Sequence, residues 1–375
     1  MPSAADNLVW LESLSPWPEE FGLDRVRDLL AALGDPQRAF RAIHVVGSNG
    51  KTTTTRLTEA LLAGEGLGVG SYTSPHVVRW SERIRVRGEE AELGEALERV
   101  RRAAESVNAT QFEVMTAAAY AEFAAAEVDV AVVEAGLGGR HDATNVLGAP
   151  VVVLTNVALE HTDVLGATRE EIAEEKLAVL SQGATAVLGE PEWEDAARRN
   201  GAATVVVAGA SNLALALAAA ETFLGDRVDP SAAEELTVPG RLERVSESPL
   251  EIWDGAHNLA GIGWLLARVP ERRYVVVASI LGDKDVDGML AALSALGDLI
   301  VVTESSNPRA LRAPDLARRA ARFFAEVEAV DDSREALIAA RDRADASGAV
   351  LVTGSLYLLA DLAALRPETP VPWRP

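Results

Sequence analysis

The sequence predicts an α/β protein of two domains, each built around a mostly parallel β-sheet. Apolar runs of strand length recur along the chain, and stretches with the apolar spacing of helices separate them. The strand-like runs are continuously apolar, which is typical of parallel strands covered by helices on both faces. The chain has 375 residues, more than a single hydrophobic core usually organises, so two domains are expected.

Buried strands are expected where apolar runs end in turn-forming or polar residues. They are residues 43–46, 128–133, 151–156, 204–207, 250–253, 274–280, 299–303 and 350–353. The clearest break between domains is the turn at Pro239 and Gly240, which follows a helical stretch at 212–224. We therefore expect an N-terminal domain over 1–238 and a C-terminal domain over 239–375.

Composition and charge argue against several classes of protein. The formal net charge is -22, whereas binding to a nucleic-acid backbone needs clustered Lys and Arg. The chain has no Cys, which excludes disulfides and thiolate metal sites. Residues 1–14 lack the basic segment of a signal peptide, and polar residues interrupt the uncharged stretch 201–220. We expect a cytoplasmic monomer that binds neither nucleic acid nor membrane.

The strongest local motif is a Gly-rich loop between a predicted strand and a predicted helix. It reads Gly47, Ser48, Asn49, Gly50, Lys51, Thr52 and Thr53. In this setting backbone N–H groups approach phosphate oxygens, the lysine reaches the β- and γ-phosphates, and a hydroxyl meets Mg²⁺. The alternative is a Gly-rich helix start with a solvated lysine, which the strand–loop–helix context disfavours. The motif predicts an ATP site with Lys51 as a catalytic residue.

Three further residues fit a metal site beside this loop. Glu134 follows the strand at 128–133, and His161 follows the strand at 151–156. Each alone also fits an ordinary loop or structural residue. Lys176 has only apolar neighbours three and four positions away on a helix over 170–180, so it is expected to be buried. A buried lysine must be paired or neutral, and a neutral one can be carbamylated to an anion that supports a metal; the alternative is a lysine extending from the core edge to solvent.

Polar residues also follow strands in the second half of the chain. Asp254, His257 and Asn258 come after the strand at 250–253 and form either a candidate site or an Asx turn with a surface histidine. Loops at 283–285 and 353–355 likewise follow strands. Because the carboxyl ends of parallel strands share one edge of a sheet, these loops are expected to line one crevice.

Taken in chain order, these motifs resemble those of the folylpolyglutamate synthase/dihydrofolate synthase family of the Mur ligase superfamily. The resemblance covers nearly the whole chain, with landmarks at 21–25, 43–53, 72–76, 111–113, 134–145, 160–163, 175–176, 239–241, 254–258 and 352–357. It implies a Mur-ligase-like fold: a three-layer P-loop ATPase domain that also binds the pterin, and a smaller Rossmann-like C-terminal ligase domain. It further implies ATP, L-glutamate and a pteroate or folate as substrates, and Mg²⁺ as the cation.

The resemblance also implies roles for individual residues. ATP would be held by the Gly-rich loop (Gly47, Ser48, Asn49, Gly50, Lys51, Thr52 and Thr53) together with Asn212, Arg241 and Asp254. Magnesium would be held by Thr52, Ser74, Glu134 and His161, and Lys176 would be a carbamylated catalytic lysine. The pterin pocket would comprise Leu23, Asp24, Arg25, Thr110, Gln111, Phe112, Glu113, His141, Asp142 and Ala143. His257 and Ser355 would orient glutamate, with His257 also counted as catalytic.

Some positions depart from the family pattern. Thr52 stands where the folate enzymes usually have Gly, Glu160 replaces Asp, Leu259 replaces Pro, His141 occupies a normally apolar position, and the segment 162–211 is short. The predicted reaction joins L-glutamate to dihydropteroate, a (tetrahydro)folylpolyglutamate or both, through an acyl phosphate, with release of ADP and phosphate. The alternatives are a Mur-type ligase acting on another, muropeptide-like carboxylate, which Thr52 favours, and a nucleotide-binding protein without ligase activity.

Overall fold

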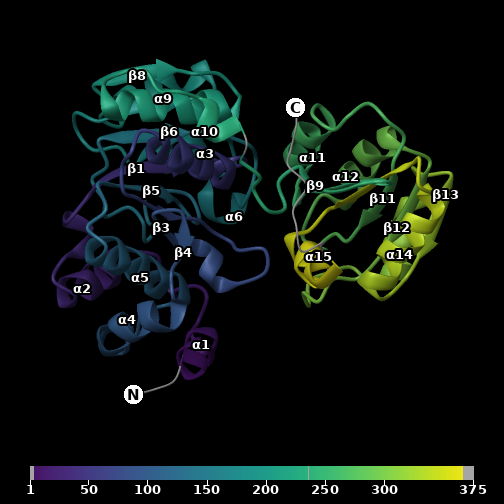
Figure 1. Ribbon diagram of the computed structural model, residues 1–375, viewed down its shortest axis with the longest axis horizontal. Helices are drawn as coiled ribbons and strands as arrows, with labels where there is room; N and C mark the ends of the chain where they lie inside the picture. The colour runs from purple at the N-terminus through teal and green to yellow at the C-terminus, as the bar shows by residue number, and fades with distance from the viewer. Residues whose placement is uncertain (1–3, 235, 366–375) are drawn as a thin grey trace. The chain divides into compact units, whose positions relative to one another are not determined.

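The protein folds into two α/β units, each with its own sheet and hydrophobic core (Figure 1). The structure is a computed structural model that describes residues 4–234 and 236–365. The units are Met1–Glu234 and Glu235–Pro375. Both sheets are mostly parallel, which confirms the predicted fold class. The boundary at 238/239 and the division of binding roles between the domains stay predictions.

The N-terminal unit contains an eight-stranded sheet in the order β4-β3-β2-β5-β1-β6-β7-β8. The six neighbouring strands β2, β5, β1, β6, β7 and β8 are parallel to one another. At the edge beside β2, β3 pairs antiparallel with β2, and β4 pairs antiparallel with β3. The strands are β1 Arg41–Val46, β2 Val69–Tyr72, β3 Ile84–Val86, β4 Glu89–Glu90, β5 Val130–Glu134, β6 Val151–Leu154, β7 Thr185–Leu188 and β8 Thr204–Val207. The central strands β5, β1 and β6 end at one edge, where the Gly-rich loop begins.

Helices cover both faces of this sheet and make a three-layer unit. On β2, Ser71 accepts a hydrogen bond from Arg56 of α3, whereas the next residue, Tyr72, accepts one from Thr116 of α5, so α3 and α5 lie on opposite faces. Helix α9 packs beside α3, and α4 packs beside α5. The helices are α1 Ala4–Ser13, α2 Asp24–Ala32, α3 Lys51–Gly64, α4 Leu93–Val107, α5 Gln111–Ala125, α6 Thr162–Leu165, α7 Arg169–Leu177, α8 Glu194–Arg199, α9 Asn212–Leu224 and α10 Ser231–Glu234, with 3-10 helices η1 Pro36–Arg38, η2 Trp80–Arg83 and η3 Pro191–Trp193.

Helix α9 shows how local sequence fixes an element near the site. Its interior is rich in Ala and Leu, which favour helix formation. Ser211 caps its start by accepting a hydrogen bond from the Ala214 N–H, and Gly225, with φ 78°, ends it in the left-handed conformation typical of a helix C-terminus. These bounds match the stretch expected from the sequence, and they place Asn212 on the first turn.

The C-terminal unit contains a six-stranded sheet in the order β13-β12-β11-β14-β10-β9. All neighbouring strands are parallel except β9, which pairs antiparallel with β10 at one edge. The strands are β9 Glu243–Glu247, β10 Leu250–Trp253, β11 Val275–Ala278, β12 Leu299–Val302, β13 Glu326–Ala329 and β14 Ala349–Thr353. The helices are α11 Leu259–Leu266, α12 Val286–Leu293, α13 Ala313–Ala320, α14 Ser333–Ala344 and α15 Leu356–Asp361, with 3-10 helices η4 Ser294–Leu296 and η5 Ala363–Leu365.

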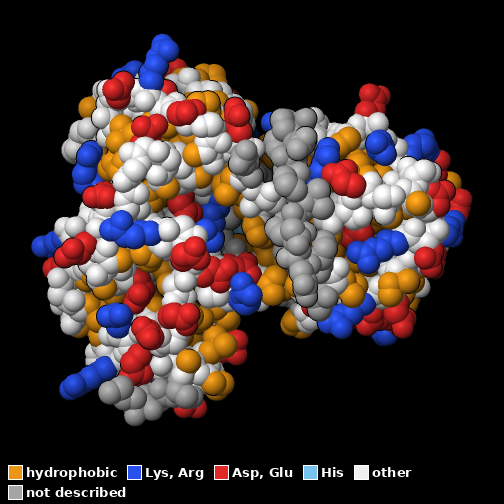
Figure 2. Space-filling model, viewed as in Figure 1, with side chains coloured by type: hydrophobic (Ala, Val, Ile, Leu, Met, Phe, Trp, Pro, Cys, Tyr) orange, Lys and Arg blue, Asp and Glu red, His pale blue; other side chains and the backbone are white. Residues whose placement is uncertain are grey.

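Charged side chains of both signs are scattered over the described surface that Figure 2 shows, and Lys and Arg do not gather there into one continuous patch. This distribution offers no basic stripe of the kind that follows a nucleic-acid backbone. Within residues 4–234 and 236–365, none of the helices combines the length and the apolar character that crossing a membrane requires.

Candidate active site

The Gly-rich loop joins β1 to α3 and is held by two residues that follow the neighbouring strand β6. The Asn49 N–H donates to Asn156 Oδ1 at 3.1 Å, and Asn156 Nδ2 donates to the Asn49 carbonyl at 3.0 Å. The Thr155 hydroxyl donates to the same carbonyl at 2.7 Å. These bonds fix the loop from one side and leave the first N–H groups of α3, which have no partner within the helix, to face a phosphate.

Two glycines in the loop are required by its geometry. Gly47 has φ 140°, and a Cβ there would collide with Thr155 Oγ1. Gly50 has φ 83°, and a Cβ there would lie 2.5 Å from Asn212 Oδ1. Helix α9 therefore brings Asn212 against the loop, where the sequence placed it as a nucleotide contact.

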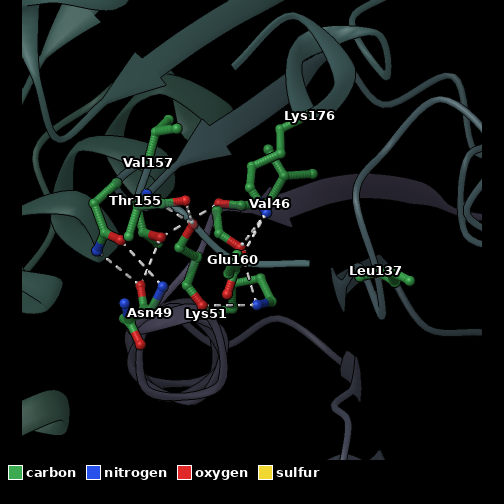
Figure 3. Close-up of polar contacts among 12 residues, drawn as sticks. Val46, Asn49, Lys51, Leu137, Thr155, Val157, Glu160 and Lys176 are labelled. Atoms are coloured by element: carbon green, nitrogen blue, oxygen red, sulfur yellow. Dashed lines mark hydrogen bonds and ion pairs between the residues drawn. The ribbon is translucent and has the colours of Figure 1, made fainter. Parts of the chain in front are cut away.

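Two lysines meet at the carbonyl of Gly47 (Figure 3). Lys51 Nζ donates to the Gly47 carbonyl at 2.9 Å and to the Ser48 carbonyl at 3.2 Å. Lys176 Nζ donates to the Gly47 carbonyl at 3.0 Å and to Glu160 Oε1 at 2.9 Å. Lys176 is 2% exposed, so its burial, predicted from its apolar helical neighbours, is confirmed.

The Lys176–Glu160 pair is electrostatically matched. Burial lowers the pKa of Lys176, although the charge of Glu160 opposes this. Burial would raise the pKa of Glu160, but the charges of Lys176 and Lys51 and the hydrogen bonds from Lys176 and Ser48 outweigh it, so the pKa falls to about 2. Glu160 is therefore a carboxylate at neutral pH, and it stabilises the two cations beside the loop.

Glu134 lies at the end of β5, beside the loop that follows β1. Its two carboxylate oxygens accept from the Thr52 hydroxyl at 3.0 and 2.9 Å, and Oε2 also accepts from the Ser74 N–H at 3.0 Å. The structure thus brings together three of the four residues predicted to hold a metal. The fourth, His161, is exposed and precedes α6 with φ 46°.

The donor set at Glu134 suits a hard divalent cation. Carboxylate and hydroxyl oxygens are the ligands that Mg²⁺ prefers, and Mg²⁺ in nucleotide sites usually keeps several waters and phosphate oxygens. In the described part of the chain no group of three or more His, Asp and Glu side chains forms a ready-made metal cluster. A cation at Glu134 would therefore take most of its ligands from nucleotide phosphates and water.

A cavity of about 260 Å³ opens in the same unit. It is lined by Pro16, Trp17, Pro18, Phe21, Gly22, Thr110, Phe112, Glu113, Leu137, His141, Asp142, Ala143, Val164, Leu165 and Glu175. Six of these residues, at 110, 112–113 and 141–143, were predicted for the pterin pocket. The aromatic rings of Trp17, Phe21 and Phe112 and the carboxylates of Glu113 and Asp142 suit a flat ring that donates N–H hydrogen bonds.

The other four residues predicted for this pocket, at 23–25 and 111, are not among the residues that line the cavity. Arg25 pairs with Glu113 at 2.8 Å, and Glu113 Oε2 also accepts from the Thr110 N–H and hydroxyl, each at 2.8 Å, at the start of α5. Gln111 donates its side-chain amide to the Leu11 carbonyl at 3.2 Å. Leu23 packs against the core, and Asp24 begins α2.

The remaining predicted residues lie in the C-terminal unit. Asp254 is buried after β10, and its oxygens accept from the Leu242 N–H at 2.8 Å and the Ala256 N–H at 2.9 Å. Burial raises the pKa of Asp254, while the nearby charge of Arg241 opposes this. His257 Nδ1 lies 2.8 Å from the Gly255 carbonyl, and Ser355 caps α15 by accepting from the Tyr357 N–H at 3.1 Å.

Four residues of the site had no role predicted from the sequence. Thr155 and Asn156 hold the loop, and His44 and Thr144, which fall within the landmarks at 43–53 and 134–145, connect to the cavity residue Asp142. A signal for the first two was present: they are polar residues directly after a buried strand, the position that elsewhere in this chain marked the site. His44 and Thr144 gave no such signal, because their contact joins residues 100 positions apart.

Known proteins match the chain over most of its length. The Mur ligase middle domain matches residues 45–234, and the Mur ligase glutamate ligase domain matches residues 240–356. The dihydrofolate synthase/folylpolyglutamate synthase of Mycobacterium tuberculosis is 34% identical over 432 residues, covering 93% of this chain and 89% of that protein. The protein of the same name from Escherichia coli strain K12 is 34% identical over 407 residues, covering 96% and 95%.

Solved structures agree with these matches. Escherichia coli FolC in complex with DHPP and ADP has a TM-score of 0.87 to this structure at 32% identity, and the match covers 97% of each chain. A bifunctional folylpolyglutamate synthase/dihydrofolate synthase with Mn, AMPPNP and L-glutamate bound has a TM-score of 0.86 at 33% identity, covering 97% of this chain and 98% of that one. Fold and site together define an ATP-dependent, amide-forming ligase. The chain belongs to the Mur ligase family and, within it, to the dihydrofolate synthase/folylpolyglutamate synthase family.

Proposed function

We propose that this protein joins L-glutamate to dihydropteroate, to a reduced folylpolyglutamate, or to both, and converts ATP to ADP and phosphate. The observation that carries the proposal is the meeting of Lys51, Lys176 and Glu134 around one Gly-rich loop, in a unit that also contains an aromatic, carboxylate-lined cavity. The relatives that bind nucleotide, DHPP and L-glutamate support the same substrates here.

The reaction proceeds in two steps. The loop N–H groups and Lys51 hold the β- and γ-phosphates, with Asn212, Arg241 and Asp254 contacting the rest of ATP. A carboxylate oxygen of the acceptor attacks the γ-phosphorus, and the bond to ADP breaks, which gives an acyl phosphate. The amine of L-glutamate, oriented by His257 and Ser355, then attacks the acyl carbon. The tetrahedral intermediate releases phosphate, and the amine loses a proton to leave the amide.

Thr52, Ser74, Glu134 and His161 would hold Mg²⁺, which would neutralise charge on the phosphates. The buried Lys176 is the proposed site of carbamylation, since its lowered pKa raises the fraction of neutral amine that can react with CO₂. The proposed acceptor pocket is the 260 Å³ cavity. Leu23, Asp24, Arg25 and Gln111 are proposed to contribute to it, and Arg25 contacts the lining residue Glu113. We also propose that the protein acts as a monomer in the cytoplasm.

The test is ADP release by purified protein with ATP, Mg²⁺ and L-glutamate, comparing dihydropteroate, tetrahydrofolate and no acceptor. We expect turnover that requires both glutamate and a pterin, with a product heavier by one glutamyl residue. Turnover with a muropeptide-like carboxylate and with neither pterin would favour the second candidate function, a Mur-type ligase for another carboxylate. Thr52 in the loop is the residue that favours this alternative. Folded protein that binds ATP and turns over no acceptor would contradict both.

A further inference from the structure

A buried chain of three side chains leads from the central strand β1 to the cavity. His44 on β1 is 1% exposed, and its Nε2 lies 2.8 Å from Thr144 Oγ1. The Thr144 hydroxyl, also buried, donates a short hydrogen bond to Asp142 Oδ1. Asp142 lines the cavity. No step of the proposed reaction uses His44 or Thr144, so the role of this buried polar chain needs its own explanation.

The direction of the hydrogen bonds along this chain follows from proton counting. Asp142 receives the Leu137 N–H on Oδ2 at 2.8 Å and the Thr144 N–H on Oδ1 at 3.0 Å, so its inner oxygens act as acceptors. A threonine hydroxyl has one proton, and Thr144 gives it to Asp142. Thr144 must therefore accept from His44, which places the imidazole proton on Nε2.

The ring of His44 is neutral, so only one of its two nitrogens carries a proton, and the tautomer decides which nitrogen donates a hydrogen bond. Burial lowers the pKa of His44 to about 4, so the ring carries a single proton at neutral pH. With that proton on Nε2, every bond in the chain points toward Asp142. Reversal would need a protonated Asp142 donating to Thr144 and the other tautomer of His44.

We propose that His44 is a positioning residue for the acceptor: through Thr144 it holds the Asp142 carboxylate in place as a hydrogen-bond acceptor for ring N–H groups of the pterin. The inference deepens the proposed function and rests on it for the identity of the ring. Burial of Asp142 raises its pKa, and the hydrogen bonds that it accepts from Thr144 and from backbone N–H groups oppose this. Loss of the Thr144 hydrogen bond would raise the pKa further and favour the protonated form, which is a weaker acceptor.

The kinetic test compares substitutions that keep or remove the Nε2–H donor. His44→Leu removes it, and we expect the KM for the pterin acceptor to rise about tenfold while the KM for ATP stays unchanged. His44→Gln keeps an N–H donor and should restore most of the affinity. Thr144→Val is isosteric and removes the hydroxyl that joins His44 to Asp142, so it should raise the acceptor KM at least as much as His44→Leu. Adding His44→Leu to Thr144→Val should cause no further loss.

A matched control is Thr58→Val, which removes a buried hydroxyl that bonds only along its own helix, to the Thr54 carbonyl at 2.8 Å. It should leave the KM for the acceptor unchanged. If His44→Leu does not fold, Thr144→Val carries the same prediction. An unchanged acceptor KM in Thr144→Val, or an equal rise in both KM values, would overturn the positioning role.

A second measurement does not depend on the activity. In protein labelled with ¹⁵N at histidine, long-range ¹H–¹⁵N spectra distinguish the two tautomers, and the His44→Gln spectrum assigns the signal among the five histidines. We expect the Nε2–H tautomer in the free protein; the Nδ1–H tautomer would overturn the proposal. Absence of turnover with any pterin, together with the Nε2–H tautomer, would instead locate the failure in the proposed function.

Discussion

Lys51 is the residue on which turnover is expected to depend most. It begins α3 and lies within the loop that faces the phosphates. We predict that Lys51→Ala lowers kcat about 100-fold or more, because the charge that develops on the transferred phosphoryl group loses its fixed cation. The measurement is ADP release at saturating ATP. Arg273→Ala, which removes an exposed cation in the C-terminal unit, is the control, and a near-normal rate in Lys51→Ala would contradict the phosphate role.

Lys176 is the residue for which a chemical modification is predicted. The chain has three lysines, Lys51, Lys176 and Lys284, so a ¹³C spectrum under ¹³CO₂ is simple to read. We expect one carbamate signal, lost in Lys176→Arg, and partial recovery of Lys176→Ala activity by added acetate. A spectrum without any carbamate signal would leave Lys176 as an ammonium paired with Glu160, as its 2.9 Å contact also allows.

In protein whose Lys176 is not carbamylated, the ion pair between Lys176 and Glu160 predicts a pH dependence of stability. Its folded-state pKa of about 2 lies below the ordinary value of 4.5, so its contribution is present above about pH 4.5 and is lost as pH falls toward 2. The full shift corresponds to roughly 3 kcal/mol. The free energy of unfolding of Glu160→Gln, from urea titrations, should therefore lie below that of wild type at pH 7, and the gap should narrow in acid. If the difference in the free energy of unfolding between the two proteins did not change with pH, it would contradict the ion pair between Glu160 and Lys176.

The sequence predicted single residues well where local pattern decides their environment. Lys176 was expected to be buried because of its neighbours on one helix, and Glu134 was expected beside the loop because both follow parallel strands. Asn156 and Thr144 were missed, because their contacts with Asn49 and His44 depend on which strands pair and how loops cross. Such contacts are decided by tertiary packing, which spacing along the chain does not reveal.

At the scale of elements, we predict that the Gly-rich loop between β1 and α3 does not tolerate a side chain at Gly47. In Gly47→Ala the new Cβ would collide with Thr155, and the backbone would keep a φ that L residues rarely adopt. We expect ATP affinity to fall at least about tenfold, with a loss of roughly 1–3 kcal/mol in the free energy of unfolding. Calorimetry with ATP and urea titrations measure both. The control is Gly34→Ala. Gly34 has φ 82°, and a Cβ added there would meet nothing within 4 Å, so this variant shows the effect of backbone strain without a collision.

Most central strands and the edge strand β8 were predicted, whereas the interior strands β2 and β7 and several edge strands were not. The predicted strands at 43–46, 151–156 and 299–303 are apolar along most of their length because helices cover both faces. The missed strands β4, β9 and β13 carry Glu residues and lie at sheet edges with one side open to water. β2 was missed because Gly70 and Ser71 weaken its apolar pattern, although all its residues are buried.

At the scale of the whole molecule, the two units are expected to unfold separately, because each has its own core. Glu251, fully buried on β10, accepts from Arg341 at 2.7 Å and from Trp253 Nε1 at 2.7 Å. We predict that Glu251→Ala destabilises the C-terminal unit by about 3 kcal/mol, since it removes the buried carboxylate to which both side chains donate. After the C-terminal unit has unfolded, the N-terminal unit should still bind nucleotide through its Gly-rich loop, with lower affinity because the contacts proposed for Arg241 and Asp254 are lost.

The matched control is Glu326→Ala, which breaks an exposed pair with Arg343 in the same unit. It should change stability by less than about 0.5 kcal/mol. Urea unfolding followed by circular dichroism and by binding of a fluorescent ATP analogue separates the two transitions. A single transition that shifts as a whole in Glu251→Ala would show that the units unfold together.

Lys51 and Lys176 both donate to the Gly47 carbonyl, so the phosphate site contains two primary amines, of which Lys51 is the one that an amine-directed reagent can label. Nearly all surface cations of this chain are guanidinium groups, which acylating reagents spare, and Lys176 is shielded by its burial. Among the described residues, a mild amine-directed reagent would therefore encounter Lys51 and Lys284 as its accessible lysines. Peptide mass mapping of such a labelled sample would report occupancy of the loop directly, as protection of Lys51 that grows with nucleotide concentration, without any need for a coupled assay.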